Sequence, residues 1–344
     1  MNPARAEDTI APPHPRETMT LCGHCEAEQA LLGAYRSTRM PHAWLIGGPP
    51  GIGKATLAYR MARFVLAHPD PGAPAVRAAQ SLAVAPEHPV ARRVAALAHG
   101  DLLALERTEG ESGALRTVIT VDQVRRTVAF FGSTAGEGGW RVCVVDSADE
   151  LKYPEASNAL LKMLEEPPRR ALFLIVSHAP GRLLATIRSR CRRLMLRPLA
   201  VEDVIEAAAA ALAVEADADL RRAAALADGS VARAIKLCDP TSFALRERLA
   251  GLLDRLPHSD PRELHALGDS LSRAHEGAFE TFLDAVRDWL TGRLAHERDG
   301  QRLARIGETW EAFNRAAGEV QVLNLDRKPF VFSAFGLLAE AARG

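Results

Sequence analysis

The sequence predicts an α/β domain built on a parallel sheet, followed by an all-helical region. Short apolar runs typical of buried parallel strands occur at residues 44–47, 141–146 and 172–176, and they alternate with helical segments. The first run leads directly into a glycine-rich loop. After Pro198 the helical periodicity continues to the end, and no convincing strand is predicted there.

The individual elements follow in order along the chain. Helices are expected over 25–35, 56–66, 120–131 and 154–166, and strands over 44–47, 101–105, 141–146 and 172–176. Thr120 and Gln123 form a capping-box pattern, and Pro167-Pro168 ends a helix. An alanine-rich helical run covers 200–226 and is broken at Gly229. The expected organisation is a flexible tail over 1–16, the sheet domain over 17–198, and helical segments over 199–240 and 241–344.

Composition excludes several classes of protein. The chain has 344 residues, and Lys+Arg and Asp+Glu are equal at 43 each, so no global charge favours nucleic acid. The proline-containing N-terminus has no apolar run of a signal peptide, and no stretch is long enough to span a bilayer. Five scattered cysteines do not suggest a secreted disulfide framework. We therefore expect a cytoplasmic protein without membrane contact.

The glycine loop resembles a phosphate-binding motif with one residue changed. Gly48, Gly51, Gly53 and Lys54 fit the pattern, which then requires a Ser or Thr whose hydroxyl holds Mg²⁺. Ala55 stands at that position. Thr56 follows, but one residue along a helix points about 100° away, so it does not replace the missing hydroxyl. The alternative is a helix-entry turn with a surface lysine.

A second acidic position follows a strand. Asp146 closes an apolar run, where an acid that contacts Mg²⁺ is expected in nucleotide-binding folds. The next residue is Ser147, and a hydroxyl cannot replace a carboxylate as a base near neutral pH. The alternative role for Asp146 is to cap the next helix.

Arg190 lies in Ser189-Arg190-Cys191, inside an arginine-rich stretch that runs from Arg188 to Arg197. An arginine offered across a subunit boundary can neutralise charge on a transferring phosphoryl group. By residue type alone, a solvated charged face fits the stretch better.

Cys22 and Cys25 have the spacing of a thiol–disulfide exchange site. Such a site should follow a strand and open a helix, and no strand is predicted before Cys22. A metal site lacks a second Cys or His pair at matching spacing. The pair is therefore a weak indication of redox chemistry.

Taken in order, these motifs resemble the clamp-loader branch of the AAA+ ATPases. The segment NALLKMLEEPP at 158–168 and the SRC tripeptide at 189–191 carry the resemblance, together with the glycine loop and Asp146. It covers residues 17–200 strongly and the remainder more loosely. It implies an AAA+ P-loop domain, a small helical lid over 199–240 and an all-α collar over 241–344.

The resemblance also implies a function and partners. It implies a largely non-hydrolysing loader subunit, in which Arg190 acts in trans on ATP held by a neighbouring subunit during DNA replication. Partners would be loader subunits of the gamma/tau and delta types and, through them, a sliding clamp and primed DNA. The expected nucleotide site, weak or vestigial, comprises Gly48, Gly51, Gly53, Lys54, Ala55, Thr56, Asp146 and Ser177, with a degraded Mg²⁺ site.

Some positions depart from the family pattern. Residues 60–140 lack the cysteines of the family's zinc module, so zinc is not expected. Ser177-His178 stands in place of the usual Thr/Ser-Asn, and Arg233 is one residue late for a second sensor arginine. Two further functions stay open: an active gamma/tau-like ATPase that tolerates Ala55, and a thiol oxidoreductase.

Overall fold

The computed structural model describes residues 13–37, 39–110, 116–132, 139–273, 276–323 and 325–343. The chain divides into a first compact unit, Ala11–Lys236, and a second that contains Leu237–Gly344. This division lies close to the one expected at residue 240. The separate lid expected over 199–240 stays a prediction, because most of that segment belongs to the first unit.

The first unit contains all five strands of the described sheet. The strands are β1 (Ala43–Gly47), β2 (Leu102–Glu106), β3 (Arg141–Asp146), β4 (Ala171–Ser177) and β5 (Arg192–Met195). The helices are α1 (Cys25–Arg36), α2 (Lys54–Ala67), α3 (Pro74–Ala78), α4 (Pro89–Ala95), α5 (Val121–Gly132), α6 (Glu155–Glu165), α7 (Ala185–Arg190), α8 (Val201–Leu212), α9 (Ala218–Ala225) and α10 (Val231–Leu237). Single turns η1 (Ala148–Glu150) and η2 (Pro180–Arg182) follow β3 and β4.

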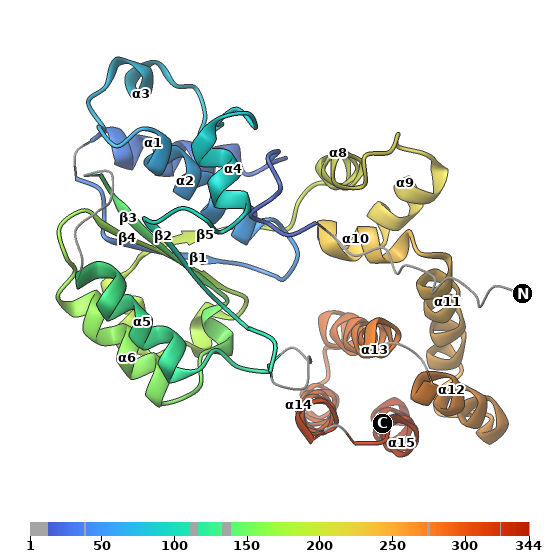
Figure 1. The fold of residues 1–344 in the computed structure, drawn as a ribbon. Coiled ribbons are helices and arrows are strands. Elements are labelled where there is room, and N and C mark those ends of the chain that lie inside the picture. Colours follow the sequence, from blue (N-terminus) through green and yellow to red (C-terminus); the bar gives the residue numbers. More distant parts are fainter. Residues whose placement is uncertain are drawn as a thin grey trace, which may run out of the picture. The chain divides into compact units, whose positions relative to one another are not determined.

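The sheet is parallel throughout, in the order β2-β3-β4-β1-β5. Alternate residues of each strand enter two separate hydrophobic cores. Trp44 and Ile46 of β1 pack on the face covered by α1 and α2, whereas Ala43 and Leu45 pack on the face covered by α5 and α6 (Figure 1). Both faces are buried, which confirms the expected α/β layers.

Most predicted elements are present, but the structure differs from the prediction at several points. The strand β5 was not predicted, because Arg192 and Arg193 give it no apolar pattern; it forms an edge and is mostly exposed. The helical run expected over 200–226 is two helices, α8 and α9. The chain turns at Ala213, which adopts a left-handed conformation with φ of 53°. Alanine content alone does not reveal such a turn.

The capping box at the start of α5 is confirmed. The Gln123 side chain accepts the backbone N–H of Thr120 at 2.8 Å, and the Gln123 backbone N–H donates to the Thr120 hydroxyl at 3.4 Å. Two short helices begin inside the proline-rich stretch after α2. Both start at a proline, where the missing N–H has no helical partner to lose.

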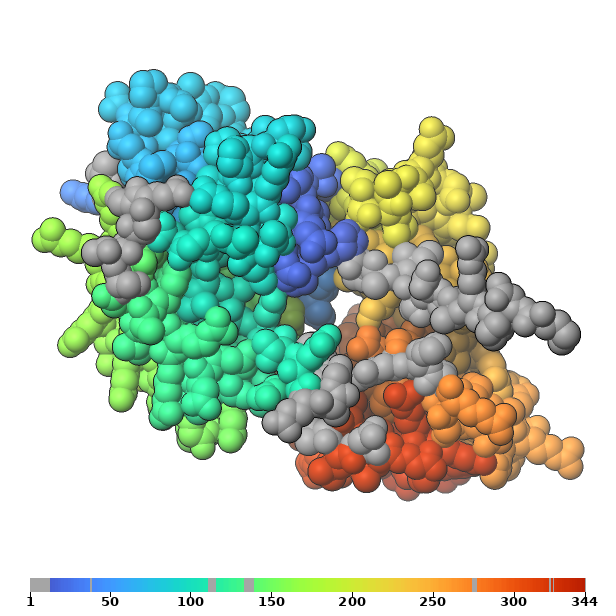
Figure 2. All heavy atoms as spheres, in the orientation of Figure 1, coloured from blue at the N-terminus to red at the C-terminus, as the bar shows by residue number. Residues whose placement is uncertain are grey.

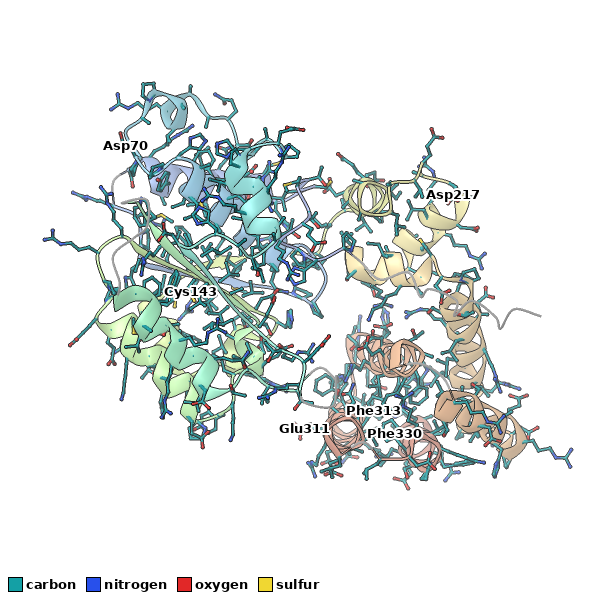
Figure 3. All side chains as sticks on the ribbon, in the orientation of Figure 1. Asp70, Cys143, Asp217, Glu311, Phe313 and Phe330 are labelled. Atoms are coloured by element: carbon teal, nitrogen blue, oxygen red, sulfur yellow. The ribbon has the colours of Figure 1, made fainter. Side chains whose placement is uncertain are left out.

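The described part of the second unit contains helices and no strands. Its helices are α11 (Pro240–Asp254), α12 (Pro261–Arg273), α13 (Glu276–His296), α14 (Gly300–Leu323) and α15 (Arg327–Arg343). They enclose one core that is rich in phenylalanine. Phe313 and Phe330, labelled in Figure 3, lie with ring centroids 5.7 Å apart within it. Among the described helices, none is long and apolar enough to cross a membrane.

Candidate functional site

The glycine loop (residues 48–55) connects the end of β1 to the start of α2. Gly48, Gly51 and Gly53 have φ values of 148°, 75° and 94°, which L side chains rarely adopt. A Cβ on Gly48 would also lie 2.6 Å from the carbonyl oxygen of Leu196. The loop therefore needs its glycines, and it brings the N-terminus of α2 to the carboxyl edge of the sheet, where parallel α/β folds bind ligands.

Lys54 is the first residue of α2 and is only 3% exposed. Its ammonium group donates to the carbonyl oxygen of Pro49, within the same loop. Burial lowers the pKa of Lys54 to about 8, although the nearby carboxylates of Asp146 and Asp149 act in the opposite direction. A buried ammonium is costly without an anion, so Lys54 suits a site that receives negative charge.

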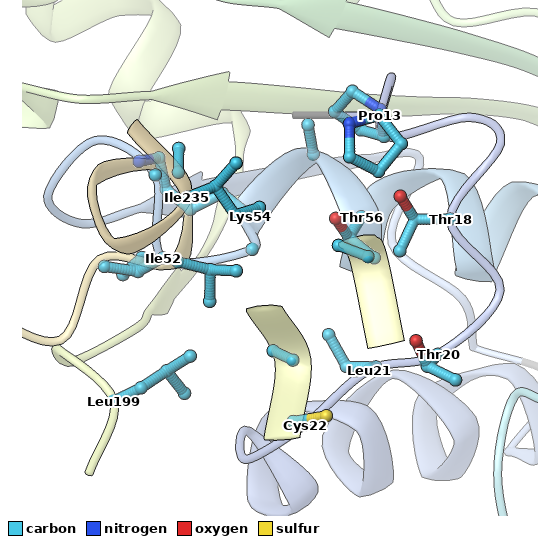
Figure 4. A pocket seen from close by; sticks show the side chains of 18 of the residues that line it. Pro13, Thr18, Thr20, Leu21, Cys22, Ile52, Lys54, Thr56, Leu199 and Ile235 are labelled. Carbon is cyan, nitrogen blue, oxygen red and sulfur yellow. The ribbon is translucent and has the colours of Figure 1, made fainter. Parts of the chain in front are cut away.

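A cavity of about 380 Å³ lies beside the glycine loop (Figure 4). Gly51, Gly53, Lys54, Ala55 and Thr56 line its loop side, so the structure brings these predicted residues together. The rest of the lining is largely apolar and comes from the N-terminal segment, β4, the residues just before α8, α8 itself and α10: Leu21, Val176, Leu199, Ala207, Ala211, Val231, Ala232 and Ile235. A mostly apolar cavity with a few polar groups at one end is typical of small-ligand sites.

Ala55 and Thr56 both contact this cavity, but they differ in chemistry. Ala55 is half-buried and packs against the hydrophobic core beneath α2. Its methyl group offers no metal ligand. Thr56 also lines the cavity. Among the described residues in the first two turns of α2, it is the only one that places a hydroxyl there.

Asp146 ends β3 and lines the cavity. Burial and the neighbouring carboxylate of Glu106 raise the pKa of Asp146, and the charges of His14, Lys54 and Arg107 oppose this. Glu106 is its register partner on β2, so two acids stand side by side at the carboxyl edge. Asp146 therefore contacts the same cavity as Lys54, from the end of β3.

Ser147 stands beside Asp146 but is 2% exposed. Its hydroxyl has no hydrogen-bond partner among the described residues. Neither its chemistry nor its burial suits a residue that would align an attacking water. The position expected to hold the hydrolytic base therefore lacks both charge and access.

Ser177 is fully buried at the end of β4 and does not line the cavity. Its hydroxyl donates to Asp149 at 3.0 Å. Asp149 also accepts the backbone N–H groups of His178 at 2.6 Å and Ala179 at 3.0 Å. This carboxylate therefore holds the start of the segment that follows β4. His178, rather than Ser177, reaches the cavity.

The N-terminal segment (residues 13–22) forms one wall of the cavity. The guanidinium of Arg63, on α2, donates to the carbonyl oxygens of Arg16 at 2.8 Å and Thr18 at 2.7 Å. Arg16 in turn donates to the Ala95 carbonyl oxygen at 3.1 Å, so the segment, dark blue in Figure 2, lies against α4. His14 pairs with Glu106 at 3.2 Å.

The tail expected over residues 1–16 must therefore be shortened. Residues 1–12 lie outside the described residues, whereas residues 14–16 are anchored by the hydrogen bonds given above. The proline-rich composition gave no sign of this attachment. The donors that create it, chiefly Arg63, stand on α2 and are distant in sequence.

Arg190 lies near the amino ends of the parallel strands, whereas the glycine loop lies at their carboxyl ends. Arg190 ends α7 just before β5, whose first residue, Arg192, pairs with Trp44 near the start of β1. The glycine loop begins after the other end of β1, about 10 Å further along the strand direction. The structure therefore does not bring Arg190 together with Lys54 and Asp146.

Two other predicted positions lie outside or at the margin of the cavity. Arg233 pairs with Asp228 at 2.9 Å, while its neighbours Ala232 and Ile235 line the cavity instead. Cys22 lines the cavity, and burial together with Glu206 and Asp203 raises its pKa to about 11. Reactive exchange cysteines have lowered pKa values, so this environment disfavours redox chemistry at Cys22. Among the described residues, no three His, Cys, Asp or Glu side chains are grouped to hold a metal ion.

Comparison with known proteins identifies the family. The family model for the DNA polymerase III delta subunit matches residues 23–200, about half of the chain. The delta' subunit of DNA polymerase III from Pseudomonas aeruginosa is 32% identical over 288 residues, which cover 82% of this chain and 81% of that protein. The delta' subunit from Escherichia coli (strain K12) is 30% identical over 296 residues, with 81% and 83% covered.

A gamma/tau subunit is similar over a shorter region. The gamma/tau subunit of DNA polymerase III from Mycobacterium bovis is 31% identical over 169 residues, which cover 48% of this chain and 26% of that protein. The two delta' relatives named above match along most of both chains. This chain therefore belongs to the delta' family of DNA polymerase III subunits.

Proposed function

We propose that this chain is a non-hydrolysing clamp-loader subunit that supplies Arg190 to ATP bound on a neighbouring subunit. The observation that carries the proposal is the separation of Arg190 from the chain's own glycine loop by the length of a strand. A phosphate that Arg190 contacts would then belong to another chain. The absence of a hydroxyl at Ala55 and of a carboxylate at Ser147 supports the same division of labour, since Ala55 lines the chain's own cavity and Ser147 follows Asp146, which also lines it.

The residues around the cavity fit a polyphosphate better than a metal–nucleotide complex. The glycine loop and the start of α2 offer backbone N–H groups, and Lys54 offers a cation. Asp146 would face a metal, but Ala55 cannot complete its coordination. Any ATP held by Gly48, Gly51, Gly53, Lys54 and Thr56 is therefore weakly bound, and no hydrolysis by this chain is expected.

Arginine suits the proposed task in trans. A guanidinium is planar, permanently charged and able to donate two parallel hydrogen bonds to phosphate oxygens. Placed against the charge that develops on a transferring phosphoryl group, such an arginine accelerates transfer by about 10³–10⁵-fold. Arg190 is 34% exposed on its side chain and stands at the end of a helix, so it can reach beyond the chain's surface.

The partners in this proposal are subunits of the gamma/tau and delta types. With them the chain would help to place a sliding clamp on primed DNA. The balance of 43 basic and 43 acidic residues favours DNA contacts that are shared by the assembly rather than concentrated on this chain.

ATP turnover tests the proposal directly. We expect no turnover above background by the chain alone, and clamp- and DNA-stimulated turnover in a reconstituted complex with gamma/tau and delta subunits. Arg190→Ala should abolish the contribution of the adjacent ATP site, measured in a single-turnover experiment. Arg193→Ala is the matched control, since Arg193 is exposed in the neighbouring strand.

Two outcomes would contradict the proposal. Turnover by the isolated chain that disappears in Lys54→Ala would instead indicate an active gamma/tau-like ATPase. A complex that is indifferent to Arg190→Ala would remove the role of Arg190 in trans.

A further inference from the structure

Arg190 is held by a carboxylate of its own chain. Its Nη2 donates to Oε1 of Glu165 at 2.7 Å, and its Nη1 donates to the carbonyl oxygen of Thr186 at 3.0 Å. Thr186 lies one turn earlier on α7, whereas Glu165 is the last residue of α6. The guanidinium is therefore anchored at two points on two different helices.

This anchoring leaves most of the guanidinium available. Arginine has five N–H donors, and the two bonds use two of them. Among the described residues the other three meet no acceptor. The side chains of Arg190 and Glu165 are 34% and 47% exposed, so a phosphate from outside the chain could bind Arg190 without first displacing Glu165.

The location of Glu165 gives a reason for the pairing. A carboxylate at the C-terminal end of a helix lies at the negative end of the helix dipole, which is unfavourable. A cation beside it offsets that cost. Glu166, the next residue, shares this location and is exposed, but it has no ion pair with Arg190 in the described part of the chain.

We propose that Glu165 is a positioning residue for Arg190: it orders the guanidinium before a neighbouring subunit's nucleotide meets it. An unanchored arginine would lose rotamer freedom on engaging the phosphates, and preorganisation removes part of that cost. This inference rests on the proposed role of Arg190 in trans. It differs from a brake, in which the charge of Glu165 would compete with the phosphates for Arg190.

Paired substitutions in the reconstituted complex separate these two roles. Glu165→Ala should lower the stimulated kcat by about threefold with KM for ATP unchanged, a size set by exposed ion pairs. Glu165→Gln keeps an oxygen acceptor in the same place and should retain most of the wild-type kcat. Glu166→Ala is the matched control and should leave kcat unchanged. Once Arg190 is replaced by alanine, adding Glu165→Ala should have no further effect.

A second measurement uses the isolated full chain. Restricted rotation of the Arg190 guanidinium, followed by nitrogen-15 NMR of the arginine side chains, should be present in the wild type and lost in Glu165→Ala. If Glu165 only stabilised the fold, its replacement would not change both the rotation of the Arg190 guanidinium and kcat.

The outcomes distinguish the two proposals. If Arg190→Ala lowers turnover but Glu165→Ala does not, the positioning role is overturned and the proposed function stands. An increase in kcat for Glu165→Ala and Glu165→Gln would establish a brake and also overturn it. If Arg190→Ala itself has no effect, both proposals fall.

Discussion

The carbonyl oxygen of Gly51 accepts a hydrogen bond from the backbone N–H of Ala232 at 3.3 Å. This bond joins the glycine loop to the start of α10, and the two segments lie in close contact around Gly51. A Cβ on Gly51 would collide with the hydroxyl of Ser230 and lie 3.0 Å from the Cβ of Ala232. The shape of the loop is thus coupled to the position of α10, which also lines the cavity.

Gly51→Ala should therefore destabilise the first unit. The substitution adds a steric conflict with Ser230 at a φ of 75°, and strained backbone of this kind costs about 1–3 kcal/mol. The matched control is Gly33→Ala, because Gly33 is an exposed helical position where a Cβ meets nothing within 4 Å. Gly33→Ala should stabilise by about 0.5–1 kcal/mol. Urea denaturation measures both, and equal stability of the two variants would contradict the close approach.

The pattern of apolar residues in the sequence was sufficient to predict most of the sheet and the helices that cover it. Four strands and the loop after β1 follow from apolar runs and glycines, because buried parallel strands need continuous apolar residues. The edge strand β5 could not be predicted in this way, because an exposed edge strand can contain arginines and needs no continuous apolar residues. The break between α8 and α9 could not be predicted either, because Ala213 adopts a conformation that its residue type does not favour.

The candidate site was predicted only in part. The glycine loop, Lys54 and Asp146 come from a local motif, and local motifs are visible in a sequence. The wall made by residues 13–22 depends on contacts with a distant helix, and no local pattern encodes such contacts. The pairing of Arg190 with Glu165 could not be predicted from a local pattern either, because the two residues are 25 positions apart in the sequence.

Arg63→Met should release the N-terminal segment from α2. Arg63 is 1% exposed, and burial and the nearby Arg60 lower its pKa to about 10, so it remains charged at neutral pH. Its hydrogen bonds to Arg16 and Thr18 would be lost, and each bond from a charged donor contributes about 1.5–3 kcal/mol. Trypsin should then cleave after Arg16 at least about tenfold faster, as followed by mass spectrometry.

The control for this experiment is Arg125→Met. Arg125 is an exposed residue of α5, with 68% of its side chain accessible. Its replacement should leave the cleavage rate after Arg16 unchanged. Equal rates for the wild type and Arg63→Met would show that Arg63 does not hold the segment.

Cys25 should be the cysteine that alkylating reagents modify first. It is exposed, whereas Cys143 is fully buried and burial raises the pKa of Cys191 to about 11. The pKa of Cys22 is also raised to about 11, so at pH 8 only about one molecule in a thousand carries its thiolate. Cys25→Ser should abolish the fast phase of iodoacetamide labelling, and Cys22→Ser should preserve it. A fast phase that depends on Cys22 would instead support a thiol oxidoreductase.

Polyphosphate binding at the glycine loop should weaken above pH 8. The pKa of Lys54 is lowered to about 8 because the side chain is buried, so the ammonium loses its proton as the pH rises through this value. A bound polyphosphate favours the protonated form and must then recruit a proton from solvent. Affinity should accordingly fall by up to about tenfold for each pH unit above 8, and stay nearly constant below it. Titration with a fluorescent ATP analogue at pH 7 and pH 9 measures the difference.

In Lys54→Ala the affinity should be lower and independent of pH over the same range, because the titrating group is gone. Equal affinities of the wild-type chain at the two pH values would mean that Lys54 does not contact the phosphates.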